Sequence, residues 1–347
     1  MTETALDETH KTKVPWQRIH IGIRWILLVS SVSLWLFVII CYTFRFDSCA
    51  VITAFPAWIW FIPGILATVL ARFPGRARWL YISVAVMWVG FVSAFADEPT
   101  SITRGLLRSI TSTTDSSFRV VSINCCLGNP LAALDAAPYE PDILLLQESP
   151  GRDKVAAITR QLFGEMGSYL YGGDTVIIVR GKIKPSTPLR GATTSMIQGH
   201  VKLVSGLELE VASIHFSPPP GRFDFWSPAT WKIYAGQRRT KRMEVATIVQ
   251  RLNALPPDTT IVIGGDFNMP STDGAWDDMP PYLYDTFDEA GVGWGNTMTS
   301  TMPAVRFDQI WVSKNLRAVE VKAIFSKNTD HLMVLSDIAM PTVSPLE

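Results

Sequence analysis

The stretch 261-IVIGGDFNMP-270 starts as an apolar strand and ends in polar side chains. Its first residues are β-branched and apolar and two glycines follow, which predicts a buried strand. Asp266 and Asn268 then appear two residues apart, and Pro270 ends the run because proline cannot donate to a strand ladder. Taken alone, the two polar residues fit an ordinary turn. Whether they serve a function depends on whether other predicted strands also end in polar residues.

The same pattern recurs along the second half of the chain. Strands are predicted at 118–124, 142–148, 175–180, 201–204, 208–216, 260–267, 306–313, 318–325 and 333–340. Acids, amides or imidazoles stand near several strand ends: Asn124, Glu148, His215, Asp266, Asn268, Asp308, Asp330 and His331. Buried charges without partners are costly, so converging carboxylates indicate either ion pairs or a bound metal.

Many short strands alternate with few helices between residues 118 and 347, where helices are predicted at 153–163 and 231–255. This pattern of many strands and few helices favours an α/β domain in which helices cover the outside of packed sheets. The Ser/Thr-rich residues 97–117 that precede the domain read as a linker.

The N-terminal part has the composition of a membrane region. Segments 25–44, 48–71 and 79–96 contain no Asp, Glu, Lys or Arg. About 20 apolar residues cross a bilayer, so all three predict spanning helices. Buried core helices are the alternative, and a signal peptide does not fit because its apolar region is shorter. We expect a cytoplasmic tail at 1–23, a transmembrane region at 24–96, the linker at 97–117 and a catalytic domain at 118–347.

Charge placement predicts the orientation of these spans. Basic residues precede the first segment, and 72-RFPGRAR-78 between the second and third has three arginines and no acid. Basic loops stay in the cytoplasm, so residues after the third span lie outside it. We expect an integral protein of a plasma membrane, such as the bacterial inner membrane, that contacts the lipid bilayer and needs no obligate protein partner.

The formal net charge of zero divides into +4 for residues 1–96 and −4 for residues 97–347. Domains that hold polyanions by charge alone are basic, which argues against a general nucleic-acid binder. The spans carry no internal charge to mark a transport pathway, which argues against a transporter or channel.

The strand-end residues resemble those of the endonuclease/exonuclease/phosphatase (DNase I-like) superfamily, over about residues 118–341 and in the same order. The matching segments are 120-VVSIN-124, 141-PDILLLQES-149, 213-SIHF-216, 265-GDFN-268, 306-RFD-308 and 329-TDH-331. The chain departs from the family pattern in having Thr329 where Ser is usual and in lacking the usual Pro shortly after His331. The resemblance implies a four-layer α/β sandwich of two mixed β-sheets flanked by helices, here preceded by three transmembrane helices. It also implies metal-dependent hydrolysis of a phosphate ester by water.

The resemblance also implies a role for each residue. Mg²⁺, or Mn²⁺ in its place, is expected at Asn124, Glu148 and Asp330. Asp266 orients or deprotonates water, and Asn268 binds a phosphate oxygen. His331 acts as base or electrostatic stabiliser with Asp308 behind it, and His215 faces the leaving group and contacts the substrate.

The substrate class stays open at this level. A nucleic acid, a lipid of the sphingomyelinase type and a small phosphodiester are all compatible with the motifs, since a fold does not determine a substrate. A catalytically silent binding module of the same fold is the remaining alternative.

Two further segments have open interpretations. The basic run Arg238, Arg239, Lys241 and Arg242 is either a contact for an anionic substrate or lipid, or a solvated helix face. The Pro-rich, aromatic segment 217-SPPPGRFDFWSPATW-231 contacts a lipid surface, stacks on a base or packs as an ordinary loop.

Overall fold

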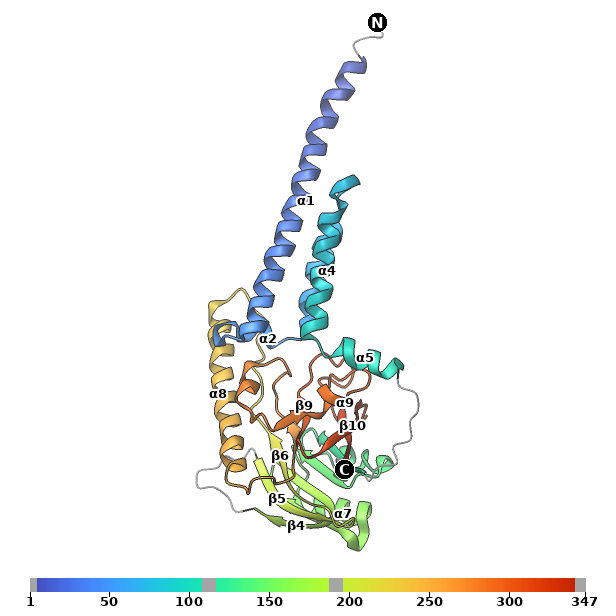
Figure 1. Ribbon diagram of the computed structural model, residues 1–347, viewed down its shortest axis with the longest axis vertical. Coiled ribbons are helices and arrows are strands. Elements are labelled where there is room, and N and C mark those ends of the chain that lie inside the picture. Colours follow the sequence, from blue (N-terminus) through green and yellow to red (C-terminus); the bar gives the residue numbers. More distant parts are fainter. Residues whose placement is uncertain (1–4, 108–116, 187–195, 341–347) are drawn as a thin grey trace, which may run out of the picture.

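The computed structural model describes residues 5–107, 117–186 and 196–340 as a helical region above one α/β domain (Figure 1). The domain contains one mixed sheet with strand order β10-β11-β1-β2-β4-β5-β6-β7-β9-β8, and β3 pairs with β4 beside this path. The strands are β1 (Ser117–Asn124), β2 (Ile143–Gln147), β3 (Gly167–Tyr171), β4 (Val176–Pro185), β5 (Met196–Leu203), β6 (Glu208–His215), β7 (Ile261–Asp266), β8 (Leu283–Asp285), β9 (Asp308–Ser313), β10 (Arg317–Ile324) and β11 (Met333–Ala339).

The sheet is continuous because β4 serves both of its halves. Residues 176–179 of β4 pair with β2, whereas residues 181–185 pair with β5. The change of partner occurs at Gly181, which has φ 155° and whose absent Cβ would lie 2.2 Å from the Lys202 carbonyl oxygen. Glycine alone tolerates this close approach. The expectation of two separate sheets is therefore corrected to one curled sheet, while the mixed α/β class is confirmed.

The two halves of the sheet pack against each other. One apolar cluster joins Val120 and Leu145 of the first half to Val211, Val262 and Ile310 of the second. A second cluster lies under α6 (Pro130–Leu134) and α7 (Arg152–Phe163) on the outer face of the first half. A third lies under α8 (Pro228–Leu252) on the outer face of the second half. The short helices of the domain are η3 (Ala137–Tyr139), η4 (Gly164–Met166), η5 (Gly274–Asp278) and α9 (Thr286–Ala290).

All nine predicted strands are present, and the described part of the chain contains two more, β3 and β8. β3 is half-buried along its whole length and pairs only with β4, so its sequence shows no apolar run. β8 has three residues, which is too short for a period to be visible.

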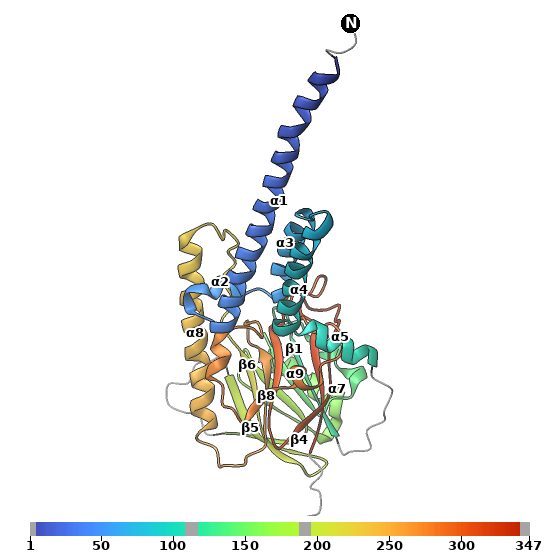
Figure 2. The ribbon, with the colours of Figure 1, turned by 45° about the horizontal axis from the view of Figure 1, so that its top comes forward.

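The helical region consists of α1 (Ala5–Phe44), η1 (Asp47–Cys49), α2 (Ala50–Thr53), α3 (Ala57–Leu70), η2 (Gly75–Ala77) and α4 (Arg78–Phe95). By length and composition, Arg18–Phe44 and Arg78–Phe95 could each cross a membrane. The second predicted span differs, because Asp47–Thr53 and Ala57–Leu70 meet at 75° and would cross only as a broken pair. Pro56 precedes α3 in an extended conformation, which explains why α2 and α3 do not form one continuous helix. Figure 2 shows α1, α3 and α4 side by side above the sheet.

Part of the predicted linker is a helix that packs on the domain. α5 (Glu98–Leu107) donates from Ser101 Oγ to the Gly293 carbonyl oxygen at 2.7 Å and from Arg104 to the Gly291 carbonyl oxygen at 2.7 Å. Asn296 Nδ2 donates to Glu98 Oε1 at 2.7 Å. The Ser/Thr composition suggested a linker because it gives no sign of these tertiary contacts. Residues 108–116 lie outside the described residues.

Candidate active site

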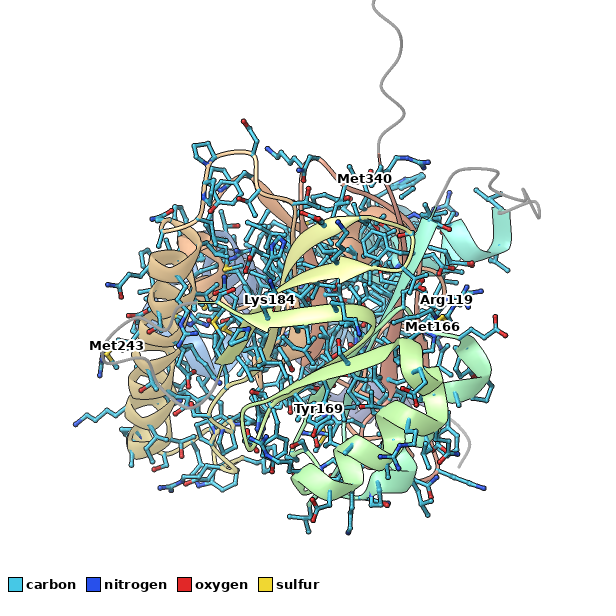
Figure 3. The ribbon with its side chains drawn as sticks, turned by 90° about the horizontal axis from the view of Figure 1, so that it is seen from below. Arg119, Met166, Tyr169, Lys184, Met243 and Met340 are labelled. Atoms are coloured by element: carbon cyan, nitrogen blue, oxygen red, sulfur yellow. The ribbon has the colours of Figure 1, made fainter. Side chains whose placement is uncertain are left out.

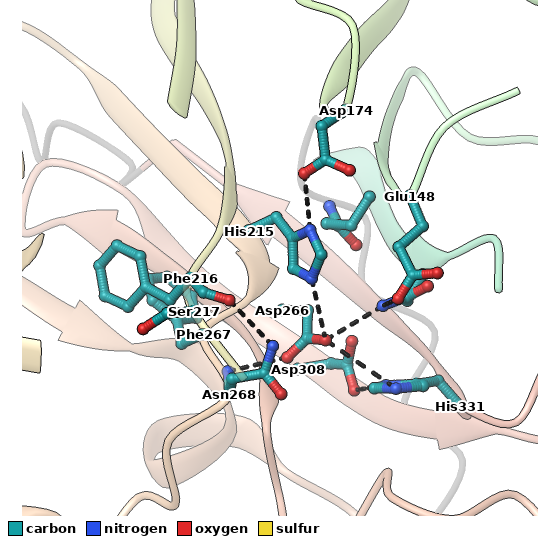
Figure 4. A network of polar contacts seen from close by, with 12 residues as sticks. Glu148, Asp174, His215, Phe216, Ser217, Asp266, Phe267, Asn268, Asp308 and His331 are labelled. Atoms are coloured by element: carbon teal, nitrogen blue, oxygen red, sulfur yellow. Dashed lines mark hydrogen bonds and ion pairs between the residues drawn. The ribbon is translucent and has the colours of Figure 1, made fainter. Parts of the chain in front are cut away.

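The register of the sheet gathers the polar strand ends at one edge. β6 and β7 are parallel with His215 opposite Asp266, and β7 and β9 are antiparallel with Asp266 opposite Asp308. Asn124 ends β1 and is opposite Gln147, directly before Glu148. The sequence patterns placed these residues at strand ends, and the folded chain brings them together (Figure 4).

Asn124 links the two carboxylates at the centre of this edge. Its Nδ2 donates to Asp266 Oδ2 at 3.1 Å and to Glu148 Oε1 at 3.2 Å, while its own Oδ1 accepts from the Cys126 amide at 2.9 Å. The other Glu148 oxygen accepts from the Leu127 amide at 2.7 Å. Glu148 is half-buried and has φ 45°, so the chain turns sharply just where this side chain enters the site.

Asp266 is fully buried and close to two histidines. His215 Nε2 and His331 Nε2 each lie 3.9 Å from Asp266 Oδ2. Burial and the nearby Asp308 carboxylate raise the pKa of Asp266, while the two imidazoles oppose that rise. A buried carboxyl group whose pKa is raised is suited to accept a proton near neutral pH.

His331 is held by Asp308, the supporting position that the family resemblance implied for this carboxylate. Its Nδ1 lies 2.8 Å from Asp308 Oδ2, and both side chains are buried. Burial alone would lower the pKa of His331, but the charge of Asp308, its hydrogen bond and the charge of Asp266 raise it to about 10. His331 is therefore an imidazolium at neutral pH in the metal-free protein.

His215 has a partner that the sequence analysis missed. Asp174 Oδ2 lies 2.6 Å from His215 Nδ1, which directs Nε2 of the ring toward Asp266. Burial lowers the pKa of His215, but the bond to Asp174 and the charges of Asp266 and Asp174 outweigh it and raise the pKa. Asp174 follows Gly172 and Gly173 between β3 and β4, where an Asp reads as a turn former, so no local signal identified it.

Asn268 is fixed immediately after β7. Its backbone amide donates to Asp266 Oδ1 at 2.8 Å and its Nδ2 donates to the Phe216 carbonyl oxygen at 3.0 Å. Gly265 allows this approach: it has φ 153°, and a Cβ there would lie 1.9 Å from the Ile214 carbonyl oxygen. The glycines before Asp266 thus permit the close packing of β6 and β7 that delivers the polar pair.

The donor set fits a metal ion. Asp266, Asp308 and His331 each offer a ligand atom, and these atoms lie within 4.8 Å of one another. Asp308 Oδ1 is buried and has no hydrogen-bond partner among the residues that the structure describes, which suits a position beside a cation or its water. Glu148 and Asn124 add oxygen donors at the same edge, the type that Mg²⁺ prefers.

Asp330 lies apart from this buried group. Its side chain is exposed and, after burial, is the main cause that raises the pKa of the Cys126 thiol, and its backbone carbonyl oxygen accepts from the Ser300 amide at 2.6 Å. Its charge still acts on His331. Of the predicted metal ligands, Asn124 and Glu148 are therefore in the central network, and Asp330 is at its rim.

The basic run on α8 is largely structural. Arg238 and Lys241 are buried, and Arg242 pairs with Asp278 at 2.9 Å. Arg238 donates to the carbonyl oxygens of Arg45 at 2.9 Å and Phe46 at 3.1 Å. A solvated face therefore does not describe Arg238 and Lys241, whereas Arg239 is exposed. Arg238 joins α8 to the chain that follows α1.

Comparison with known proteins identifies the fold and the family. The solved structures that resemble the chain include two endonuclease/exonuclease/phosphatase proteins, one from Bacteroides thetaiotaomicron and one from Bacteroides vulgatus. The first is 15% identical with a TM-score of 0.50, over 66% of this chain and 100% of its own. The second is 14% identical with a TM-score of 0.50, over 65% of this chain and 99% of its own. At such identities the likeness shows the fold alone.

Among curated protein sequences, none matches this chain significantly. The family model described as "Endonuclease/Exonuclease/phosphatase family" matches residues 121–331, which includes every polar strand end from Asn124 to His331. The chain belongs to the endonuclease/exonuclease/phosphatase family.

Proposed function

We propose that the protein is a divalent-metal-dependent hydrolase of phosphate esters, anchored in a membrane with its catalytic domain outside the cytoplasm. The observation that carries the proposal is the convergence of Asp266 with Asn124, His215 and His331 at one edge of the sheet. A silent binding module would not need a buried carboxylate between two histidines that each have a carboxylate partner.

The charge states support a division of roles. Asp266 accepts the proton of the attacking water, since burial raises its pKa and the Asn268 amide fixes its other oxygen. His331 is held protonated by Asp308 and stabilises negative charge on the phosphate, so it is the electrostatic stabiliser rather than the base.

A different histidine, His215, acts on the leaving group. His215 is oriented by Asp174 and donates a proton to the leaving oxygen as the phosphorus–oxygen bond breaks. Asn268 has one amide hydrogen beyond its bond to Phe216 and binds a phosphate oxygen.

Glu148 and Asn124, with Asp330 at the rim, are the residues we assign to hold Mg²⁺ or Mn²⁺. When bound, a divalent cation supplies neutralisation of the phosphate charge. The cluster of Asp266, Asp308 and His331 is the second donor set at the same edge.

The anchoring is supported by the apolar helices and by the basic loop between α3 and α4. A reporter that functions only in the cytoplasm, fused after residue 347, stays silent if the domain is outside. A signal from that reporter would overturn the orientation.

The catalytic proposal is tested with the full chain in detergent micelles and a panel of phosphate esters, assayed with Mg²⁺, with Mn²⁺ and with EDTA. The panel contains plasmid DNA, RNA, a sphingomyelin, an inositol phosphate and a chromogenic phosphodiester. We expect turnover of at least one substrate that EDTA abolishes. Metal-independent turnover, or none on any substrate, contradicts the proposal.

A further inference from the structure

The aromatic segment from Phe223 to Trp231 packs against the apolar helices rather than against the sheet. The Trp231 ring lies 6.3 Å from that of Phe37 in α1. The Phe225 ring lies 5.2 Å from the Phe55 ring and edge-on to it, and Phe223 lies 6.3 Å from the same ring. Phe225 and Trp231 belong to the apolar cluster of the helical region. The segment is thus continuous with the proposed membrane spans.

The contact with Phe37 indicates how far this segment reaches into the bilayer. Phe37 precedes Phe44, the last residue of α1, by seven residues, which is about 10 Å at 1.5 Å per residue. The apolar residues 25–44 are just long enough for a hydrocarbon core of about 30 Å. A side chain that packs on Phe37 therefore lies several ångströms inside the outer boundary of that core.

The exposed side chains of the segment are those that lipid would cover. Phe223 is 65% exposed and Trp226 is 85% exposed, and Phe44 and Phe46 at the end of α1 are exposed as well. The charges between them are neutralised locally, since Arg222 Nη2 lies 2.5 Å from Asp224 Oδ2. Aromatic side chains beside a paired charge are typical of elements at a membrane interface.

The catalytic edge faces the same side as this segment. Figure 3 views the domain from the end opposite the helices and shows Arg119 near the start of β1 and Met340 just after β11. Asn124 and His331, at the other ends of these strands, therefore lie toward the helices.

Hydrogen bonds tie the chain just beyond Asn268 to the helical region. Ser271 Oγ donates to Asp97 Oδ2 at 2.8 Å, and Thr272 Oγ1 donates to the Thr53 carbonyl oxygen at 3.1 Å. On another loop of the same edge, the Trp294 ring lies 6.0 Å from that of Trp58 in α3. The domain is docked on the helices through its catalytic edge and does not hang from a flexible tether.

We infer that the segment Phe223–Trp231 is embedded in the outer leaflet and holds the catalytic edge against the bilayer, so that the substrate is a phosphate ester of a membrane lipid headgroup. The inference rests on the spans and the hydrolase chemistry of the proposed function and adds the partner surface and the substrate class. Lipid headgroups present their phosphates at the surface that this edge faces. A nucleic acid stacked on the same aromatic rings would need a basic approach, whereas residues 97–347 carry −4.

Cysteine labelling in reconstituted vesicles tests the embedding. The full chain is placed in vesicles of phosphatidylethanolamine and phosphatidylglycerol as Trp226→Cys, Phe223→Cys or Met243→Cys. Met243 is the matched control, because it is 64% exposed but lies on α8 twelve residues beyond Trp231, which is about 18 Å farther along the helix. Labelling of the unsubstituted chain, which has four free cysteines, is subtracted.

A charged maleimide is expected to modify position 243 at the rate seen in denaturant and positions 223 and 226 at least about tenfold more slowly. A polarity-sensitive fluorophore at 223 or 226 is expected to be quenched by lipids with a nitroxide on the acyl chain, and one at 243 is not. Equal labelling at all three positions without quenching at 223 and 226 overturns the embedding. Two positions are used so that one altered side chain does not decide the result.

The substrate class is tested on the unsubstituted chain in the same vesicles, with Mg²⁺, by mass spectrometry of released headgroups. Plasmid DNA and a soluble chromogenic phosphodiester serve as competing substrates. Release of a phosphorylated or dephosphorylated headgroup supports the inference. Turnover of DNA or of the soluble diester with no lipid hydrolysis overturns the substrate class and leaves the proposed function intact. No turnover of any substrate contradicts the proposed function itself, while the labelling result still decides the embedding.

Discussion

His331 Nδ1 lies 2.8 Å from Asp308 Oδ2, and both side chains are buried at the edge of the sheet where β9 begins and β11 is about to begin. These residues are 23 positions apart in sequence. The pair fixes which nitrogen of the imidazole faces Asp266 and keeps the ring protonated.

Asp308→Asn is expected to lower the pKa of His331 from about 10 toward its ordinary value of 6.5, because the charge and hydrogen bond that raise it are lost. NMR titration of the histidines in the metal-free full chain measures this shift. A His331 pKa that stays near 10 in the variant would show that another group holds the proton.

The same pair predicts a pH dependence of stability. A folded pKa above the unfolded one means that the stabilisation is complete below pH 6.5 and is lost as the pH rises through about 10. Asp308→Asn should therefore lower the melting temperature of the metal-free protein most near pH 6 and least near pH 10. A constant difference in melting temperature across this range argues against the charge state assigned to His331.

Asp174→Asn tests the histidine partner that the sequence did not reveal. Loss of the carboxylate leaves His215 less basic and less well oriented. We expect a decrease in kcat of about 10- to 100-fold with a small change in KM, the usual scale for a supporting carboxylate. Asp153→Asn, an exposed acid on α7, is the control and should retain full activity. Equal activity of the two variants would remove Asp174 from the mechanism.

Metal binding distinguishes the two donor sets. If Glu148 and Asn124 hold the ion, Glu148→Gln weakens Mn²⁺ binding by about tenfold or more, because a charged oxygen ligand is lost. Asp308→Asn should weaken it less. Titration followed by electron paramagnetic resonance of free Mn²⁺ compares the two variants. The reverse order of affinities would assign the ion to Asp266, Asp308 and His331.

Arg306→Met is expected to destabilise the domain strongly. Arg306 is buried and pairs with Asp285, with Asp97 at 2.8 Å and with Asp288 at 2.9 Å. Its removal leaves the buried Asp285 without its cation, which costs about 3–5 kcal/mol. Lys202→Met breaks the exposed pair with Glu208 and should leave the unfolding midpoint nearly unchanged, because water screens such a pair. Urea unfolding of both variants in micelles provides the comparison, and similar midpoints would contradict the role of Arg306.

The sequence predicted those parts of the domain that have a local cause. Apolar, β-branched runs fold as the buried strands β1, β2, β6 and β7, and the polar residues at their ends meet because the strand register brings them to one edge. The half-exposed β3 and the helix α5 have no such run. Contacts with residues near 291–296 hold α5 in place, and these are not visible in its own sequence.

Long-range partnerships were also hidden from the sequence. Asp174 and His215 are 41 positions apart, and nothing around Asp174 differs from a Gly-Gly turn. Arg238 reads as one cation of a basic run, yet it is buried against the chain at Arg45 and Phe46, about 190 positions earlier. Such roles depend on the tertiary arrangement of distant segments, which composition and periodicity do not encode.

Asp266 is the residue on which the account depends most, because it lies between Asn124, His215 and His331. The most direct test is the turnover of a soluble chromogenic phosphodiester by the full chain and by Asp266→Asn, with saturating Mg²⁺ and with equal folding checked by circular dichroism. We expect metal-dependent turnover that falls by about 10²- to 10⁴-fold in the variant, the usual contribution of a positioned base. Turnover that stays within a factor of about two of the unsubstituted rate would contradict the site assignment, since loss of such a base must lower the rate far more.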